Sequence, residues 1–246
     1  MMRKSDIALD ISKKVIDGII SGILIALGGA AFLACYDADI PYTKYVGAVL
    51  FSVALLCICM RGYALYTGKI GFVVKKHTKD DISLLLLCLL GNAIGTVAFG
   101  YLIGWVFPEI KATALTLCAS KLSQGYGFGL LRAALCGILV YLAVDIYHNN
   151  KSTLGILLCI PAFVLSGYEH SIADIFYFAA SGIASGEALL YLLMIIIGNS
   201  LGSLLIPILQ LVRPRGGKGA EGGNVTQKGK GAESNDATQD DNISKR

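Results

Sequence analysis

Three ionisable side chains lie within one otherwise apolar stretch of the sequence, "LSGYEHSIADIFYF" (residues 165–178). They are Glu169, His170 and Asp174. An imidazole titrates near neutral pH, so His170 can lend a proton or a positive field to a weak-acid anion. Ionisable groups in a strongly apolar setting are costly and tend to mark functional sites. This stretch is therefore the first candidate for a site that handles protons or small ions.

The composition around these residues is that of a membrane protein. Of 246 residues, 55% are hydrophobic and only 15% are charged. The charges gather before residue 18, near residues 75–81 and after Leu211. The stretches between them have the length that a bilayer requires, about 20 residues each. We expect an all-α protein that crosses the membrane several times, with no nucleic-acid partner.

Six spans are predicted, at residues 15–36, 45–74, 82–107, 126–148, 153–179 and 187–212. Most Lys and Arg residues fall on one side of these spans, which predicts that this side and both termini are cytoplasmic. The other side receives Lys44, Lys111 and, if it lies in a loop, Lys121. Residues 1–212 form the expected membrane domain. The Gly-rich tail, residues 213–246, buries too little apolar surface to fold and is predicted to be disordered.

The second and fifth spans are too long and too interrupted to be simple helices. They break at "MRGYALYTGKIG" (60–71) and at "SGYEHSIAD" (166–174). Unwound backbone inside a membrane is tolerated where it lines a cavity. Matching breaks in two halves indicate an inverted repeat of two three-helix units, with a site near the midplane.

A Gly-Asn motif follows each break, "GNAIGT" (91–96) and "GNSLGS" (198–203). The motifs support the repeat, because each lies at a similar distance after its broken span. The alternative interpretation is that the glycines are small residues that let helices pack closely.

The sequence gives little support to an enzyme or a cofactor protein. The seven cysteines lie almost entirely in apolar spans, without the spacing of a metal site. No HExxH motif and no cluster of carboxylates within the spans indicates hydrolytic chemistry. We expect no enzyme activity, no cofactor and no bound metal.

Five motifs in order resemble the formate/nitrite transporter family, which also includes hydrosulfide channels. "GYEHSIAD" resembles the family's central histidine loop and "LYTGK" its second-span loop. The two Gly-Asn motifs match its third and sixth spans. "ASKLSQGYGFGLLRAALCGILVYLAVD" (119–145) resembles its fourth-span entry and includes Lys121. The resemblance covers about residues 10–212.

The resemblance implies an aquaporin-like protomer, a homopentamer in the inner (plasma) membrane, and one pore in each protomer. It implies that small monovalent anions pass: formate, nitrite or hydrosulfide, with acetate and lactate as further candidates. By matching position, His170 lies between two hydrophobic constrictions and Thr67 lies in a mobile loop beside one of them. Asn199 is the polar partner in the sixth span. The constrictions are formed by Phe51 and Phe163, and by Leu55, Tyr66 and Val140.

The resemblance also assigns roles to charged residues. Lys121 is expected at the external approach, where a cation concentrates anions; the alternative is a lysine that only reaches the membrane interface. Glu169 is expected to bond unwound backbone amides, or else to relay protons.

Several positions depart from the family pattern. Gly137 replaces a frequent Asn, and Tyr66 replaces Phe. Lys69 and Asp174 both stand where the family has Asn, at the ends of the two broken-helix loops. Their opposite charges suggest an ion pair between the loops; the alternative is that each reaches water separately.

A channel for small neutral solutes, of aquaporin type, is the alternative function. The NPA motifs of aquaporins do not occur in the sequence. The ammonium-channel family needs about eleven spans and twin pore histidines, which this sequence also lacks.

Overall fold

A computed structural model describes residues 4–36, 40–75 and 78–213. All regular secondary structure in these ranges is helical, which confirms the all-α prediction. Within the described residues, five helical segments are long and apolar enough to cross a membrane: Ile11–Tyr36, Thr43–Arg61, Asp81–Val106, Tyr126–Asn150 and Gly186–Val212. The predicted disorder of residues 214–246 lies outside the described residues, as do Arg3, Lys76 and Lys218 of the predicted basic side.

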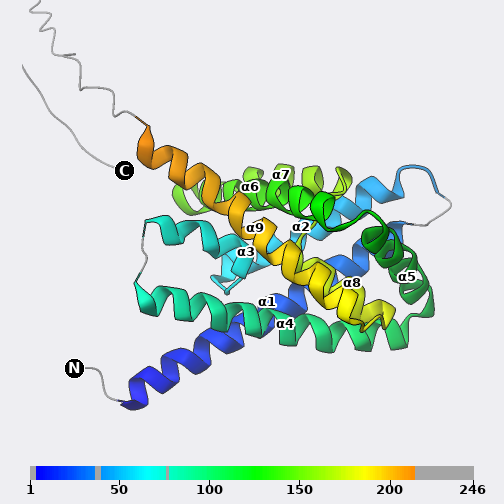
Figure 1. Cartoon of the computed structure of the whole chain (residues 1–246), viewed down its shortest axis with the longest axis horizontal. Helices are drawn as coiled ribbons and strands as arrows, with labels where there is room; N and C mark the ends of the chain where they lie inside the picture. The colour runs from blue at the N-terminus through cyan, green and yellow to red at the C-terminus, as the bar shows by residue number, and fades with distance from the viewer. Residues whose placement is uncertain (1–3, 37–39, 76–77, 214–246) are drawn as a thin grey trace, which may run out of the picture. The chain divides into compact units, whose positions relative to one another are not determined.

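Nine α-helices and one short 3₁₀ helix make up the described part of the membrane unit (Figure 1). Helix α1 packs along α4 and α2, α6 packs along α9 and α7, and α8 lies against α4 and α5. In chain order they are α1 (Lys4–Tyr36), α2 (Thr43–Arg61), α3 (Tyr66–Lys69), η1 (Ile70–Val74), α4 (Lys79–Val106), α5 (Pro108–Ser123), α6 (Tyr126–Asn150), α7 (Leu154–Leu165), α8 (Ser171–Ser181) and α9 (Gly186–Val212).

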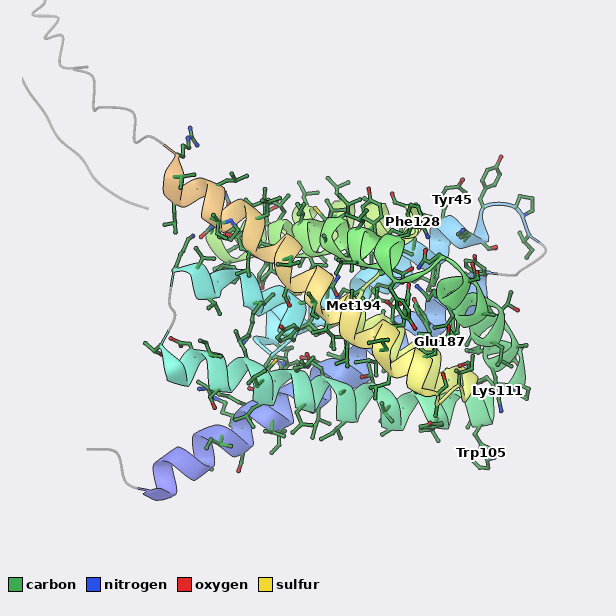
Figure 2. The ribbon with its side chains drawn as sticks, in the orientation of Figure 1. Tyr45, Trp105, Lys111, Phe128, Glu187 and Met194 are labelled. Carbon is green, nitrogen blue, oxygen red and sulfur yellow. The ribbon has the colours of Figure 1, made fainter. Side chains whose placement is uncertain are left out.

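The outer faces of the long helices carry many large apolar side chains. Trp105 at the end of α4 is 81% exposed and Phe128 at the start of α6 is 68% exposed, and both point outward (Figure 2). Exposed apolar surface of this extent is unusual for a protein surrounded by water. It suits a surface covered by lipid or by another protein chain.

The two predicted breaks are present, and both follow one backbone pattern. Helix α2 ends at Gly62 (φ 73°) and the chain after α7 turns through Gly167 (φ 67°), the left-handed conformation that glycine adopts without strain. The chain is then extended at Leu65 (φ −114°) and at His170 (φ −113°). Helical structure resumes directly afterwards, in α3 and α8.

This pattern corrects the expected position of two residues. Lys69 and Asp174 were predicted in the unwound loops, but they lie within α3 and α8. The unwound parts are shorter than the sequence motifs, because the backbone returns to helical hydrogen bonding at Tyr66 and Ser171. Glu169 does lie in an unwound segment, as predicted.

Helix α5 was not predicted. Its 16 residues are too few to span a membrane and include Glu109, Lys111 and Lys121, so the segment reads as a polar connection. It begins with Pro108 in the first turn, a favoured position for proline. Because α5 packs against α8, it brings Lys121 to the protein interior.

The glycines of the two Gly-Asn motifs let neighbouring helices approach closely. A Cβ atom on Gly95 would collide with the backbone of Ile19 in α1, and one on Gly202 would collide with Ala134 in α6. The packing interpretation of these motifs is therefore correct for the glycines. It does not account for the asparagines beside them.

Candidate functional site

Asn92 and Asn199 hold the two broken segments with matching sets of hydrogen bonds. Asn92 Oδ1 accepts from the backbone N–H of Tyr66, and Asn92 Nδ2 donates to the carbonyl oxygens of Ala64 and Gly18, each at 2.8 Å. Unwound amides and carbonyls buried without partners would cost about 1–3 kcal/mol each. The side-chain amide therefore replaces the hydrogen bonds that the broken helix lacks.

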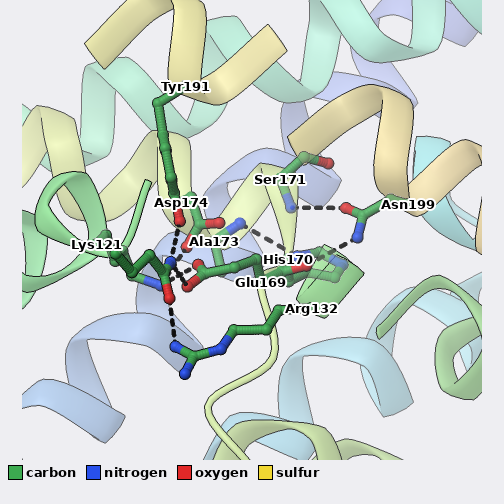
Figure 3. Close-up of polar contacts among 10 residues, drawn as sticks. Lys121, Arg132, Glu169, His170, Ser171, Ala173, Asp174, Tyr191 and Asn199 are labelled. Carbon is green, nitrogen blue, oxygen red and sulfur yellow. Dashed lines mark hydrogen bonds and ion pairs between the residues drawn. The ribbon is translucent and has the colours of Figure 1, made fainter. Parts of the chain in front are cut away.

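The second clamp repeats these contacts. Asn199 Oδ1 accepts from Ser171 N–H, and Asn199 Nδ2 donates to the carbonyl oxygens of Glu169 and Ala133, each at 2.8 Å (Figure 3). Asn199, predicted to lie on the substrate pathway, is completely buried, and its side chain forms hydrogen bonds to backbone groups. Its contacts are those of a structural clamp.

His170 is buried and both of its ring nitrogens are engaged. Nδ1 accepts from the backbone N–H of Ala173 at 3.2 Å and so caps the first turn of α8. Nε2 lies 2.9 Å from Thr67 Oγ1. Because Nδ1 is an acceptor, the ring proton lies on Nε2, and the imidazole is neutral in this arrangement. Thr67, expected in a mobile loop, is instead completely buried in α3.

Aromatic rings cover one side of His170. Phe163 stacks on the imidazole, with ring centroids 5.6 Å apart and planes inclined by 16°. Phe51 meets Phe163 edge to face, with centroids 6.1 Å apart. The predicted pairing of Phe51 with Phe163 is therefore present as a contact, directly beside the histidine.

Two cavities lie on different sides of this central region, and they share no lining residue. The large cavity has a volume of about 740 Å³ and is lined by Leu55, Leu65 and a group of basic residues: Lys14, Lys69, Lys75, His148 and Lys151. The small cavity has a volume of about 90 Å³ and is lined by Phe163, His170, Lys121, Asp174 and Tyr177, among others. His170 lines the small cavity, and its hydrogen-bond partner Thr67 directly precedes Gly68, which lines the large one.

The remaining predicted constriction residues lie inside the protein. Leu55 is buried and lines the large cavity. Val140 is buried and lines neither cavity. Tyr66 is also buried, and its hydroxyl is hydrogen-bonded to Ser200 at 2.9 Å. Of the second predicted set, Leu55 alone is therefore in contact with a cavity.

Lys121, expected at the external approach, lines the small cavity and is buried. It is only 8% exposed, and its Nζ forms an ion pair with Glu169 and lies 3.0 Å from Asp174 Oδ1 (Figure 3). The reason is tertiary: α5 turns this side chain inward, toward two carboxylates that need a counter-charge. Glu169 therefore bonds Lys121 and not backbone amides.

The suggested pair of Lys69 with Asp174 is also corrected. Asp174 is 1% exposed and takes Lys121 as its partner, whereas Lys69 is exposed and lines the large cavity. Asp174 does not reach water either, so the alternative interpretation holds only for Lys69.

A series of hydrogen-bonded polar side chains beside this cluster was not predicted from the sequence. Gln124 Nε2 donates to Glu169 Oε1 at 2.8 Å and to the hydroxyl of Tyr191, and Arg132 donates to Gln124 Oε1. The series links the buried cluster to the exposed Arg132 (Figure 3). Gln124 follows Lys121 by three residues at the end of α5, a spacing that would have linked the two had the helix been predicted.

Comparison with known proteins gives a consistent result. A family model described as "Formate/nitrite transporter" matches residues 2–212. Formate-nitrite transporter 2 of Toxoplasma gondii is 27% identical over 233 residues, which cover 80% of this chain and 50% of that protein. Nitrite transporter NirC of Salmonella typhimurium is 30% identical over 144 residues, which cover 53% of this chain and 54% of that protein. The matches therefore span about half the length of these two relatives.

Solved structures share the fold. A pentameric formate channel with formate bound has a TM-score of 0.72 at 20% identity, covering 82% of this chain and 96% of its own. An FNT family ion channel has a TM-score of 0.69 at 24% identity, covering 82% of this chain and 88% of its own. At such identities the likeness establishes the arrangement of the helices.

Proposed function

The chain belongs to the formate/nitrite transporter family, whose model matches residues 2–212, and on that premise we propose that it is a membrane channel for small monovalent anions. Membership in a family of transporters agrees with the prediction that the chain is not an enzyme. Formate, nitrite and hydrosulfide are the candidate substrates.

The proposed architecture has six membrane passages. Five are the long apolar helices or include one of them, with α2 continued by α3 and η1, and the sixth is formed by α7 and α8 together. The chain then consists of two inverted three-helix repeats. The matching clamps of Asn92 and Asn199 support this proposal, because equivalent side chains bond equivalent backbone atoms in both halves.

The proposed assembly is a homopentamer in the inner (plasma) membrane, with one pore in each protomer. The exposed apolar helix faces support contact with lipid and with neighbouring protomers. A structural neighbour described as a pentameric formate channel supports the number of protomers. The basic lining of the large cavity supports a cytoplasmic position for it, and with it cytoplasmic termini.

One observation carries the functional proposal: His170 lines the small cavity and is hydrogen-bonded to the buried Thr67, whose neighbour Gly68 lines the large cavity. A pathway that joins the cavities must pass this pair. Leu55 and Leu65 then form the constriction toward the large cavity, and Phe51 and Phe163 the one toward the small cavity. Narrow apolar segments exclude hydrated ions by dewetting. Movement of Thr67 away from His170 would free an N–H donor in the middle of the pathway.

Flux measurements in proteoliposomes test this function. The wild-type protein should carry formate, nitrite or hydrosulfide faster than protein-free liposomes do. Leu55→Trp should abolish that flux by filling the pathway, whereas Leu211→Trp, at an exposed position near the end of α9, should leave it unchanged. Glycerol flux without anion flux would overturn the proposal in favour of a neutral-solute channel.

A further inference from the structure

One ammonium group faces two carboxylates beside the small cavity, which Lys121 and Asp174 line. Lys121 Nζ bonds Glu169 and lies 3.0 Å from Asp174 Oδ1. The exposed fractions of the three residues are 8%, 2% and 1%. A buried charge is tolerated when it is paired and hydrogen-bonded. One lysine can neutralise one carboxylate, so the fully ionised cluster would carry one surplus negative charge.

The two carboxylates differ in the number of hydrogen bonds that they accept. Glu169 receives hydrogen bonds from Lys121 and from Gln124 Nε2. In the described part of the chain, neither Asp174 oxygen accepts a hydrogen bond from a well-aligned donor. Glu169 and Asp174 both contact the ammonium group of Lys121, so the two carboxylates converge on one nitrogen. Two carboxylates can bond one another only when one of them carries a proton.

Among the described residues, Lys121 is the cation that forms an ion pair with Asp174. His170 is neutral, because Nδ1 accepts the Ala173 N–H. In the sequence, α1 has no charged residue after Asp17 and α4 none after Asp81. Lys44 at the cavity wall lies over the ring of Tyr36. The other titratable side chains around Asp174 are thiols and phenols, which are uncharged near neutral pH at their ordinary pKa values: Cys118, Cys136, Tyr177 and Tyr191.

We propose that the small cavity holds one proton between Glu169 and Asp174 at rest, and that Asp174 passes this proton to the anion that enters. This inference rests on the proposed function and names the group that sets its chemistry. Two carboxylates that share a site cannot both ionise readily, so a shared proton is the expected state. It also gives the carboxyl group of Asp174 a hydrogen bond in addition to its ion pair with Lys121.

The proton transfer balances without any further reactant. The Asp174 O–H bond breaks as a bond forms between that proton and the anion, which leaves a carboxylate and a neutral weak acid. The neutral acid crosses the Phe51–Phe163 constriction at a much lower desolvation cost than a bare anion would. Asp174 then regains a proton from water on the side of the small cavity, so each anion crosses together with one proton.

His170 cannot take this role in the arrangement seen here. A neutral imidazole has no readily lost proton, and protonation of Nδ1 would remove the acceptor that caps α8. Its remaining N–H can still donate a hydrogen bond to a passing solute. The histidine is therefore the polar contact in the middle of the pathway, and the carboxylic acid is the proton donor.

The test compares the wild type with Asp174→Asn in proteoliposomes that contain a pH-sensitive dye, with formate as the probe. The wild type should carry about one proton per formate, and its flux should not respond to an imposed membrane potential. Asp174→Asn should lower the flux about tenfold or more, and the remaining flux should respond to the potential. Asp145→Asn, on α6 beside Tyr141, is the matched control and should behave as the wild type. Unchanged flux and proton ratio in Asp174→Asn would overturn the proposal.

A second measurement is independent of transport. Infrared spectra of the detergent-solubilised wild type at neutral pH should contain the carbonyl band of a protonated carboxylic acid. That band should be lost in Asp174→Asn and retained in Asp145→Asn. A wild-type spectrum without the band, or a band that survives in Asp174→Asn, would overturn the inference. A wild type that shows the band but carries no anion would contradict the proposed function alone.

Discussion

The two broken segments are held alike but equipped differently. Asn92 and Asn199 make the same three kinds of hydrogen bond, to the carbonyl before the break residue, to the N–H after it and to a neighbouring helix. The residue between the clamped groups is Leu65 in the first segment. In the second segment it is His170.

The segments also continue differently after the clamp. Helix α3 has four residues and ends at the exposed Lys69, whereas α8 has eleven residues that are all buried and include Asp174. The scaffold is thus duplicated, but the ionisable groups are concentrated in the second segment. Gly and Asn are therefore the residues that both broken segments share. The ionisable residues of the second segment occupy positions that do not take part in holding the break.

The largest expected effect comes from the clamps themselves. Asn92→Leu and Asn199→Leu should each lower the free energy of unfolding by about 3 kcal/mol or more, because each leaves buried backbone groups without partners. Thermal unfolding of the detergent-solubilised protein measures this loss, with the exposed Asn150→Leu as the control. The two losses should be similar; a much smaller loss in one variant would mean that the halves are not held alike.

The next effect concerns the residue between the clamped groups. His170→Leu makes the second segment resemble the first and should reduce anion flux about tenfold or more, since a polar contact worth about 1.4 kcal/mol or more disappears from the pathway. Stability should fall by only about 1 kcal/mol, the usual value of an N-terminal cap.

For His170→Leu, the number of protons that accompany each anion decides whether His170 or Asp174 is the proton donor. It should remain as in the wild type, because Asp174 is intact. A lowered proton ratio would return the proton-donor role to the histidine. A flux equal to that of the wild type would remove His170 from the pathway.

A smaller effect on transport is expected at the constriction beside Leu65. Leu55→Ala should allow chloride to leak, because a wider apolar segment no longer excludes water. The same change should cost about 2–5 kcal/mol of stability, as for other buried leucines. Chloride efflux from liposomes measures the leak, and Val53→Ala, at a 47% exposed position of the same helix, is the control. Tight chloride retention in Leu55→Ala would place the constriction elsewhere.

The sequence was sufficient for the features that depend on local composition. Apolar length located four of the long apolar helices to within four residues of their ends, and Gly62 and Gly167 lie in stretches that the sequence already marked as breaks. The correspondence of the two breaks followed from the Gly-Asn motif at a similar distance after each of them. Each of these signals lies within one short segment.

The features that the sequence did not reveal depend on contacts between distant segments. Helix α5 is too polar and short to be recognised as a membrane helix. One of its faces is nevertheless buried, and on that face Lys121 meets Glu169, which directly precedes His170 at the start of α8. The matching positions of Lys69 and Asp174 suggested a pair, but one lines the large cavity and the other the small cavity. Equivalence between repeats indicates a similar backbone, and it does not bring equivalent side chains together.

The smallest expected effect comes from Lys69, and it tests whether Lys69 interacts with Asp174. Lys69 is exposed, so Lys69→Asn should change the free energy of unfolding by less than about 0.5 kcal/mol. When Lys69→Asn is combined with Asp174→Asn, the two changes should be additive within about 0.5 kcal/mol, because the residues share no partner.

The double-mutant cycle of Lys121→Gln with Asp174→Asn should instead show a coupling energy of about 0.5–3 kcal/mol, since these groups are in contact and buried. Thermal or denaturant unfolding in detergent measures both cycles. Coupling in the Lys69 cycle equal to that in the Lys121 cycle would mean that the ends of the two segments do interact, and the contrast between an exposed and a buried end would have to be abandoned.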